Sequence, residues 1–251
     1  MLLFLGGATA LQGAPPVASD RPVRKVSIKT GDGWTIRADY RPPRPRKPVA
    51  ILVHGAESGK YEWESFSKRL GALGMGTLAI DLRGHAESTA GPRGKETFRA
   101  ALDGPNAWPS AREDIRAAER YVRKRASGSA VGIVGASIGA NLASEVFRED
   151  RRAAWLVLLS PGIEYRGVRL AAPDRGPVAV AASPGDPYAF GSARLLARQA
   201  PFVKFIPAPR GHGVQMFSDA RFTRELLDWI AGAAGLRKRR EPGSSGPARS
   251  R

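Results

Sequence analysis

Polar and apolar side chains alternate near the start of the chain, and this pattern predicts a β-hairpin. The alternation covers residues 24–30 and 34–40, as expected for strands with one solvated face. Gly31-Asp32-Gly33 separates the two segments, and a glycine-rich connection of this length favours a tight reversal of the chain. We therefore expect two antiparallel strands here.

Further along, short runs of uninterrupted apolar residues replace the alternation. A strand that is covered on both faces of a parallel sheet has this composition. The runs occupy residues 49–53, 76–81, 131–134, 154–159, 178–182 and 203–206. Together with the hairpin they predict a sheet of about eight strands, most of them parallel.

The segments between these runs have helical periodicity. Helices are predicted at residues 63–73, 111–125, 140–147, 192–200 and 220–231. The last of them carries one apolar stripe, formed by Phe222, Leu226, Leu227 and Ile230. A hairpin followed by repeated strand–helix units is typical of a doubly wound α/β fold with helices on both faces of a mostly parallel sheet. The length of 251 residues suits one such domain, which we place at residues 23–236.

The two ends of the chain differ in composition from this domain. Residues 1–22 combine an apolar stretch, a small-residue cleavage pattern at Ala8-Thr9-Ala10 and a proline-rich linker, and we interpret them as a signal remnant and linker. No basic residue precedes the apolar stretch, so a loosely docked N-terminus is the alternative. The protein would be secreted or periplasmic in the first case and cytoplasmic in the second. Residues 237–251 are rich in Gly, Ser, Pro and Arg, which predicts a basic, disordered tail.

Composition excludes several classes of function. The chain has no cysteine, which excludes disulfides, thiolate metal sites and a cysteine nucleophile. None of the three histidines has a metal-like spacing to another ligand, so we expect neither a metal nor another cofactor. No stretch is long and apolar enough to span a membrane.

The net charge of +17 arises from 40 Lys and Arg against 23 Asp and Glu. A charge of this size is compatible with binding to nucleic acid or another polyanion. However, arginine is spread over the whole chain without aromatic interleaving, and residues 237–251 alone carry six basic side chains against one acidic. We therefore interpret the charge as solvated surface and expect no nucleic-acid partner. The oligomeric state is left open.

Candidate chemistry is concentrated at Gly135-Ala136-Ser137-Ile138-Gly139. The serine follows a predicted strand and precedes a predicted helix, and a turn this sharp needs glycine-sized neighbours. Such a turn points the hydroxyl out of the sheet, close to the amide of Ile138. That amide, at the N-terminus of the helix, is a free donor for a developing negative charge. The pattern predicts a nucleophilic serine.

A serine nucleophile needs a base, and the base needs an acid that orients it. The three histidines, His54, His85 and His212, all follow predicted strands, and sites in an open parallel sheet form at the carboxyl ends of the strands. Among the acids, Asp186 follows a predicted strand, whereas Asp174 precedes that strand and belongs at the opposite edge. Asp186 is therefore the expected orienting acid.

From residue 23 to residue 234 the sequence resembles the α/β-hydrolase family. The resemblance is carried by the serine turn, by the order Ser137, Asp186, His212, by His54-Gly55 after the first parallel strand, and by Asp-Leu-Arg-Gly-His-Ala-Glu-Ser at residues 81–88. Ala86 stands where the family pattern has glycine, which affects only the geometry of that loop. Four motifs in this order are specific for the fold and the triad, but they say little about the substrate.

The resemblance implies a role for each residue of the triad. Ser137 would attack the substrate, His212 would accept and later return the proton, and Asp186 would hold the imidazole and stabilise its charged form. The backbone amides of Ala56 and Ile138 would form the oxyanion hole. No cofactor takes part in this chemistry.

Supporting roles follow for residues around these groups. His54 is expected to buttress the oxyanion turn and His85 to order its loop, while Asp81 and Arg83 are expected to form a local ion pair. Asp114 is expected on a solvated helix face, with a cap or an ion pair beneath the site as the alternative. Gly135 and Gly139 are expected to support the serine turn because its flanking positions need to be glycine-sized, and the resemblance implies a supporting role for Gly55 in the oxyanion turn.

The segment that follows the strand at 154–159 bears on the substrate. Only residues 160–176 are available for a lid, so we expect an open, shallow pocket for small or extended acyl substrates. Four side chains are candidates either to line it or to belong to ordinary packing: Trp108, Tyr165, Tyr188 and Met216. A carboxylesterase-type serine hydrolase is the leading hypothesis. The alternatives are a peptidase-like, thioester-cleaving or haloperoxidase-like relative, a non-catalytic binding protein, and a polyanion binder acting through its tail.

Overall fold

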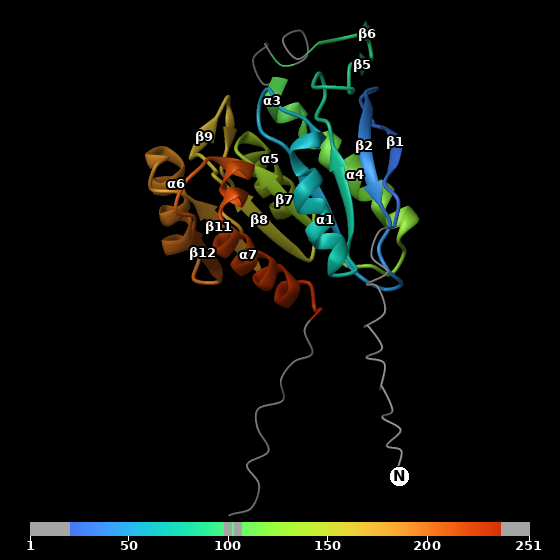
Figure 1. The fold of residues 1–251 in the computed structure, drawn as a ribbon. Coiled ribbons are helices and arrows are strands. Elements are labelled where there is room, and N and C mark those ends of the chain that lie inside the picture. The colour runs from blue at the N-terminus through green and yellow to red at the C-terminus, as the bar shows by residue number, and fades with distance from the viewer. Residues whose placement is uncertain (1–20, 98–101, 103–106, 237–251) are drawn as a thin grey trace, which may run out of the picture.

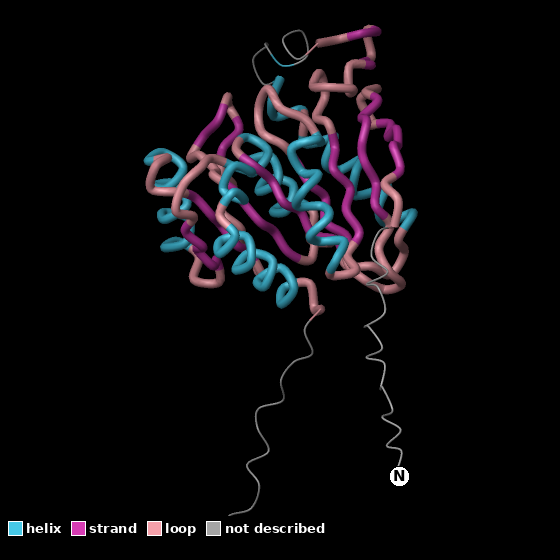
Figure 2. The backbone as a smooth tube through the Cα atoms, in the orientation of Figure 1, coloured by secondary structure: helices cyan, strands magenta, loops and turns pink. Residues whose placement is uncertain are grey.

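A mixed β-sheet forms the centre of the fold, and helices cover both of its faces (Figures 1 and 2). The computed structural model describes residues 21–97, 102 and 107–236. The predicted tail at 237–251, and all of the predicted leader except its last two residues, lie outside this part. In the part described, no helix is long and apolar enough to cross a membrane.

The strands of the main sheet are β1 Arg24–Lys29, β2 Thr35–Arg41, β3 Val49–Val53, β4 Gly76–Ile80, β5 Ala90–Gly91, β6 Gly94–Lys95, β7 Val131–Ala136, β8 Trp155–Leu159, β11 Val178–Ala182 and β12 Val203–Pro207. Their order is β12-β11-β8-β7-β3-β4-β2-β5-β6, with β1 beside β2. The strands from β12 to β4 in this order are parallel, and β2 is antiparallel to both β4 and β1.

Every strand predicted from the sequence is present, and the predicted fold class is confirmed. The structure adds β5 and β6 to the sheet and a separate pair, β9 (Glu164–Tyr165) and β10 (Val168–Arg169). Each of these four strands has only two residues, which is too short for an alternating pattern to show in the sequence.

The helices divide between the two faces of the sheet. Their bounds are η1 Lys60–Trp63, α1 Glu64–Ala72, α3 Ala107–Ser110, α4 Arg112–Arg125, α5 Ile138–Glu149, α6 Pro187–Gln199, η2 Gly213–Ser218 and α7 Ala220–Ala233. Side chains of α4, α5 and α6 pack into the apolar cluster on one face, and those of α1 and α7 pack into the cluster on the other. The sheet is therefore doubly wound.

Two helices begin earlier than their apolar periodicity predicts. α6 begins at Pro187 because Asp186 caps it: Oδ1 of Asp186 accepts the N–H of Ala189 at 3.3 Å. Proline fits the first turn because the N–H that it lacks would have no partner inside the helix. α5 begins at Ile138, directly after Ser137. A turn determines the first residue of α5 and a cap that of α6, and neither feature can be seen in the pattern of apolar residues.

The strand order reverses direction at β3. From β3 the chain continues to β4 on one side and later returns to β7 on the other. Open α/β sheets bind ligands beyond the carboxyl ends of their strands at such a switch point. Val53 at the end of β3 lies opposite Gly135 near the end of β7, so the loops that follow these strands begin side by side.

A buried carboxyl group in α4 makes the stability of the fold depend on pH. Glu119 is 1% exposed, and its contact with Arg123 is long, at 3.4 Å. Burial, reinforced by the charge of Asp150, raises the pKa of Glu119 from 4.5 to about 7. The folded state then holds this proton more tightly than the unfolded state does. As the pH rises from the ordinary pKa of 4.5 through about 7, ionisation of Glu119 therefore lowers the stability of the folded state.

We expect Glu119→Gln to increase the free energy of unfolding by about 1–3 kcal/mol at about pH 8 and to change it little at about pH 4, where both states are protonated. Urea unfolding of both proteins at the two pH values measures this difference. Glu225→Gln, at an exposed position of α7, is the matched control and should show no pH-dependent gain. An equal effect of Glu119→Gln at both pH values would contradict the assignment.

Candidate active site

Ser137 lies in a strained turn between β7 and α5. Its φ of 54° and ψ of −126° fall in a region that residues with a side chain rarely occupy. The N–H of Ser137 donates to the carbonyl of Leu159 in β8 at 2.8 Å, and its own carbonyl accepts the N–H of Ala140 in α5 at 2.9 Å. The sheet and the helix thus hold the turn from both sides. Strain that is maintained in this way is concentrated at functional sites.

The glycines on either side of the serine are required by close backbone contacts. A Cβ added to Gly135 would lie 2.3 Å from the carbonyl oxygen of Gly139, and one added to Gly139 would lie 2.4 Å from the carbonyl oxygen of His54. Backbone atoms cannot give way as the end of a flexible side chain can. The contacts agree with the supporting role expected for both glycines, and they place α5 directly against the end of β3.

The loop after β3 brings a second backbone segment to the serine. A Cβ added to Gly55 would lie 3.2 Å from Cβ and 3.9 Å from Oγ of Ser137. Ala56 is the next residue along this loop. Ile138 is the first residue of α5, so its N–H has no acceptor within the helix. The two amides expected to form an oxyanion hole therefore belong to segments that meet at Ser137.

Asp186 and His212, from the loops after β11 and β12, are in direct contact. Nδ1 of His212 lies 2.5 Å from Oδ2 of Asp186. Because the carboxylate only accepts, Nδ1 carries the proton and Nε2 is left able to accept another. The His212 side chain is 43% exposed, so this second nitrogen belongs to an open site.

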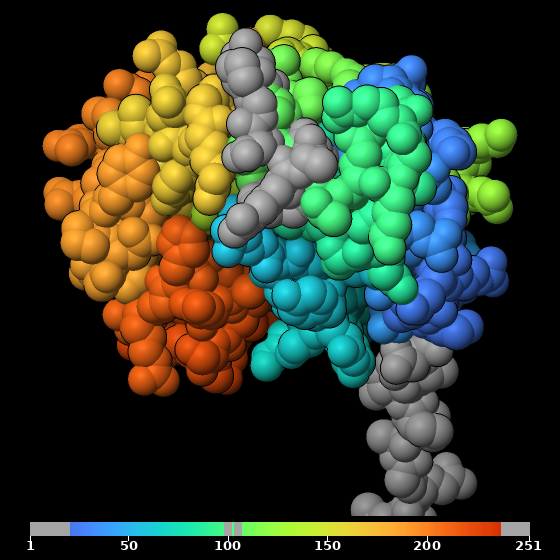
Figure 3. All heavy atoms as spheres, turned by 90° about the horizontal axis from the view of Figure 1, so that it is seen from above, coloured from blue at the N-terminus to red at the C-terminus, as the bar shows by residue number. Residues whose placement is uncertain are grey.

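Two contacts of Gly213 hold the loop that contains His212 beside the turn that contains Ser137. The N–H of Gly213 donates to Oγ of Ser160 at 2.9 Å, and a Cβ added to Gly213 would lie 3.3 Å from Cβ of Ala136. The residue after His212 thus approaches the residue before Ser137. Figure 3 views this edge of the sheet from above, where the segments after β3 (cyan), β8 (yellow) and β12 (red) converge. Sequence reasoning missed Ser160, whose only signal was its position directly after a predicted strand.

His54 and His85 contact the backbone of the loops that follow β3 and β4. His54 is fully buried: its Nδ1 lies 2.6 Å from the carbonyl of Gly55, and its Nε2 accepts the N–H of Leu82 at 2.9 Å. Burial, reinforced by His85, lowers the pKa of His54 to about 3, so His54 stays neutral. Nδ1 of His85 lies 3.0 Å from the carbonyl of Arg83. Through these contacts His54 links the loops after β3 and β4, and His85 contacts the backbone of its own loop.

The predicted ion pair between Asp81 and Arg83 is wrong. Asp81 instead accepts from the backbone N–H and from Nζ of Lys60, at 2.7 Å and 2.6 Å. Arg83 pairs with Asp114 through Nη2 and Oδ1 at 2.7 Å. The two side chains serve different layers, because Lys60 belongs to η1 on one face of the sheet and Asp114 to α4 on the other.

Asp114 is fully buried, so the expected solvated position on its helix is also wrong. It accepts from the backbone N–H of Arg83 at 2.8 Å and from Nε of Arg83 at 3.0 Å. Asp32, in the turn between β1 and β2, accepts from Nη1 of the same guanidinium at 2.6 Å. Arg83 thus joins the loop after β4 to α4 and to the hairpin turn. A buried pair of this kind contributes little net stability, but it fixes the position of the loop.

The short segment after β8 forms the hairpin β9–β10, and α5 holds it in place. The side chain of Asn141 is fully buried, and its Nδ2 donates to the carbonyls of Gly162 and Val168, both at 2.9 Å. Its Oδ1 accepts the N–H of Gly162 at 3.2 Å. The helix that follows Ser137 therefore also positions this hairpin.

The four side chains considered for the pocket divide into two pairs. Trp108 and Met216 are buried and belong to the apolar core. The rings of Tyr165 and Tyr188 lie 5.6 Å apart. Burial, with a further contribution from the charge of Asp186, raises the pKa of Tyr165 to about 12. Of the four, the two tyrosines therefore lie beside the acid of the candidate triad.

Sequence reasoning also missed a half-buried carboxyl group beside the loop after β3. Glu62 in η1 accepts from Oγ of Ser58 at 2.5 Å. Burial raises the pKa of Glu62, although Ser58, the backbone of Gly55 and the charge of His212 act in the opposite direction. Glu62 therefore braces the loop that contains Gly55 and Ala56.

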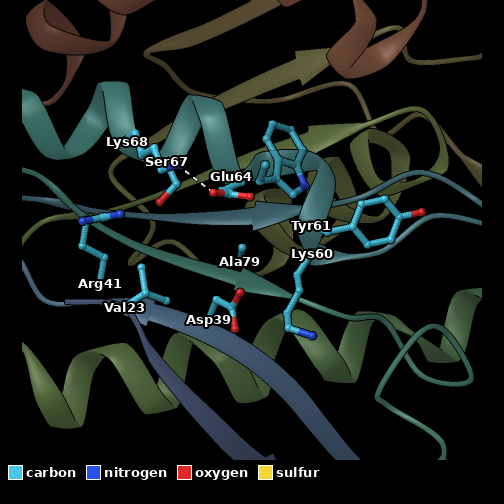
Figure 4. A pocket seen from close by; sticks show the side chains of 10 residues that line it. Val23, Asp39, Arg41, Lys60, Tyr61, Glu64, Ser67, Lys68 and Ala79 are labelled. Atoms are coloured by element: carbon cyan, nitrogen blue, oxygen red, sulfur yellow. Dashed lines mark hydrogen bonds and ion pairs between the residues drawn. The ribbon is translucent and has the colours of Figure 1, made fainter.

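A hollow of about 250 Å³ lies apart from these residues, between α1 and β2 (Figure 4). Lys60 and Lys68 line it, but Lys60 is bound to Asp81 at 2.6 Å and Lys68 to Glu64 at 2.7 Å. No residue of the candidate triad lines this hollow. In residues 21–97, 102 and 107–236, no group of three or more His, Asp or Glu side chains is placed to hold a metal ion.

Comparison with known proteins identifies the family. The model of the alpha/beta hydrolase family matches residues 50–248. This match covers most of the chain, and the protein belongs to the alpha/beta hydrolase family. No match was found among curated proteins.

Solved structures share the fold at low sequence identity. An esterase from Pyrococcus furiosus is 15% identical with a TM-score of 0.66, over 92% of this chain and 96% of that one. An alpha-beta serine hydrolase homologue from Coxiella burnetii is 18% identical with a TM-score of 0.63, over 83% and 96%. A dienelactone hydrolase from Anabaena variabilis is 14% identical with a TM-score of 0.65, over 87% and 99%. These similarities confirm the predicted fold.

We expect Gly135→Ala to lower the free energy of unfolding by about 3 kcal/mol or more, because the new methyl group would meet backbone atoms of α5. Gly191→Ala in α6 is the matched control. A Cβ at that position meets no atom within 4 Å, and alanine favours the helix. Thermal denaturation of both variants tests this difference. A Gly135→Ala protein as stable as the wild type would show that the turn does not need a glycine.

Proposed function

We propose that this protein is a serine hydrolase that cleaves carboxylic esters with Ser137, His212 and Asp186. The observation that carries the proposal is the 2.5 Å contact between Nδ1 of His212 and Oδ2 of Asp186, in loops beside the strained turn of Ser137. Membership in the alpha/beta hydrolase family supports a hydrolase. A fold hosts many reactions, so the arrangement of these three side chains supports the proposal more than the fold does.

In the first half of the proposed reaction, Oγ of Ser137 attacks the ester carbonyl while Nε2 of His212 takes its proton. The carbonyl oxygen becomes an oxyanion, which the N–H groups of Ala56 and Ile138 stabilise. Asp186 stabilises the imidazolium through Nδ1. The tetrahedral intermediate then collapses, and the alcohol leaves with the proton that His212 returns to it.

In the second half, water hydrolyses the acyl-enzyme by the same steps. His212 takes a proton from the water as its oxygen attacks the acyl carbonyl, and the same two amides stabilise the second oxyanion. Collapse releases the carboxylic acid and returns the proton to Ser137. Each backbone donor in such a hole contributes about 3–4 kcal/mol to transition-state stabilisation in comparable enzymes.

The surroundings of the triad favour small or extended acyl groups. The side chain of His212 is 43% exposed, and Tyr188 is 49% exposed. The segment after β8 supplies only the two-residue strands β9 and β10. Such a site offers a long acyl chain little apolar surface in which to become buried. A peptidase-like or thioesterase-like enzyme would use the same triad and is the alternative.

A fluorophosphonate, which reacts with activated serines, is expected to label the wild-type protein and Ser127→Ala but not Ser137→Ala. Ser127 is exposed and serves as the matched control. Asp186→Asn should lower kcat on a short p-nitrophenyl ester by about 10³–10⁴-fold, because the imidazole loses the partner that orients it. Gel fluorescence and steady-state kinetics measure these effects. An unlabelled wild-type protein would refute the enzymatic proposal in favour of a binding role.

Among p-nitrophenyl esters of increasing acyl length, we expect kcat/KM to be greatest for the shortest chains and about tenfold or more lower for the longest. The physical reason is the open site, which does not bury a long chain. Thioester and anilide substrates with the same short acyl group separate esterase from thioesterase and peptidase activity. Cleavage of the longest chains alone would contradict the open-site interpretation.

A further inference from the structure

A second hollow lies at the opposite edge of the sheet from the candidate triad, where the parallel strands begin. It has a volume of about 610 Å³, and its charged lining consists of Arg21, Arg24, Lys25 and Arg125. Among the described residues that line it, none is Asp or Glu. Arg24 begins β1, and Arg125 ends α4, so the strand register and a helix terminus bring these cations together. Figure 1 shows that β1 and α4 both reach the edge of the sheet where the parallel strands begin.

The pairing of β1 with β2 explains how this hollow is built. Arg24 lies opposite Tyr40 in the register, and residues directly opposite each other share one face of a sheet. Tyr40 packs into the apolar cluster on the face that α4 covers. There its ring lies 5.6 Å from that of Tyr121, and the guanidinium of Arg125 lies 5.4 Å from the centre of the Tyr121 ring.

Three of the four cations have no acidic partner in the part of the chain that the structure describes. Arg21, Arg24 and Arg125 form no ion pair there, whereas Lys25 contacts Glu87 at 3.2 Å. Elsewhere the pattern differs: in the hollow beside α1 shown in Figure 4, Lys68 is bound to Glu64 and Lys60 to Asp81, which lies outside the lining. Unpaired arginines around one concave surface leave a positive potential that an anion can neutralise.

Tyr40 supplies a polar group at the floor of the same hollow. Its side chain lines the hollow but is only 5% exposed, and its hydroxyl makes no hydrogen bond with a described residue. The hydroxyl is not among the enclosed side-chain atoms that lack a partner, so it is accessible from the hollow. Burial, reinforced by Tyr121, raises the pKa of Tyr40, although Arg125 and Arg24 act in the opposite direction. The hydroxyl therefore stays protonated at neutral pH and is available as a donor.

A hollow of about 210 Å³ adjoins the first and shares Arg21 and Pro42 with it. Its lining also includes Arg41 and Arg44, and none of its described lining residues is acidic. Arg41 is 4% exposed, and its Nη1 donates to the carbonyl of Arg21 at 2.8 Å. The segment that carries Arg21 is thus held in place by a buried side chain, which favours a preformed site.

We propose that these two hollows form a binding site for a ligand that carries two or more phosphate groups. Guanidinium groups bind phosphate oxygens through paired N–H donors, and the Tyr40 hydroxyl adds a neutral donor at the floor. Either a small organic polyphosphate or a phosphorylated lipid headgroup offers this chemistry. The site does not depend on the proposed hydrolase activity, because it lies at the other edge of the sheet.

Isothermal titration of the full chain with inorganic tripolyphosphate tests the site. We expect binding by the wild type that Arg24→Glu/Arg125→Glu weakens at least tenfold, and that Tyr40→Phe weakens by a smaller factor, since it keeps the ring and removes only the donor. Arg120→Glu is the charge-matched control: it is exposed on α4 and does not line the hollow, so it should bind like the wild type. Circular dichroism confirms that each variant is folded.

Three outcomes would overturn the proposal. They are no binding of tripolyphosphate by the wild type, equal weakening in Arg120→Glu and in the double variant, and unchanged binding in the double variant. The second outcome would indicate diffuse attraction, and the third a contact outside the hollow.

Co-sedimentation distinguishes the two sources of the ligand. It compares vesicles of phosphatidylcholine with and without a phosphoinositide. Binding to the phosphoinositide vesicles that the double variant loses assigns a lipid headgroup. Binding of tripolyphosphate alone assigns a soluble ligand.

Discussion

The close approach of two backbones at the centre of the sheet is the constraint on which the candidate site depends. Gly139 at the start of α5 leaves no room for a Cβ against the carbonyl oxygens of Val53 and His54, and Gly135 leaves none against Gly139. This contact brings the loop after β3 to the serine turn. It also forces Ser137 into a conformation with positive φ, which the hydrogen bonds to Leu159 and Ala140 maintain. One packing contact therefore positions Ser137, the proposed nucleophile, and both proposed oxyanion donors.

Buried charges position the loops around this contact. Arg83 joins three segments through Asp114 and Asp32, and Lys60 joins η1 to the end of β4 through Asp81. Isolated pairs of this kind add little to stability once the cost of removing the charges from water is counted. Their effect is geometric: each guanidinium or carboxylate accepts only a few arrangements of its partners, so the loops at the carboxyl edge are held in one. The histidine loop is held differently, by the neutral hydrogen bond from Gly213 to Ser160.

The two edges of the sheet use positive charge in different ways. At the carboxyl edge, the buried cations are bound to carboxylates, and the proposed chemistry depends on neutral backbone donors and on one histidine. At the amino edge, Arg21, Arg24 and Arg125 surround a hollow in which no described lining residue is acidic. The net charge of +17 is a property of the whole chain and does not distinguish one edge from the other. Only the location of each charge relative to its partners separates a structural ion pair from a site that can receive an anion.

The layers of the fold and the chain order of the candidate triad could be predicted from the sequence alone. Alternating and continuous apolar runs placed the eight longer strands, because burial on one face or on both leaves a local pattern. Glycines beside Ser137 and histidines after strands could also be recognised locally. The early start of α6 could not, because a local cap at Asp186 sets it and leaves no apolar periodicity. The partners of Asp81, Arg83 and Asp114 and the role of Ser160 depend on contacts between residues distant in the chain, such as Gly213 with Ser160, 53 residues apart. They follow from the tertiary structure, since these contacts depend on distance in space and leave no periodic trace in the sequence.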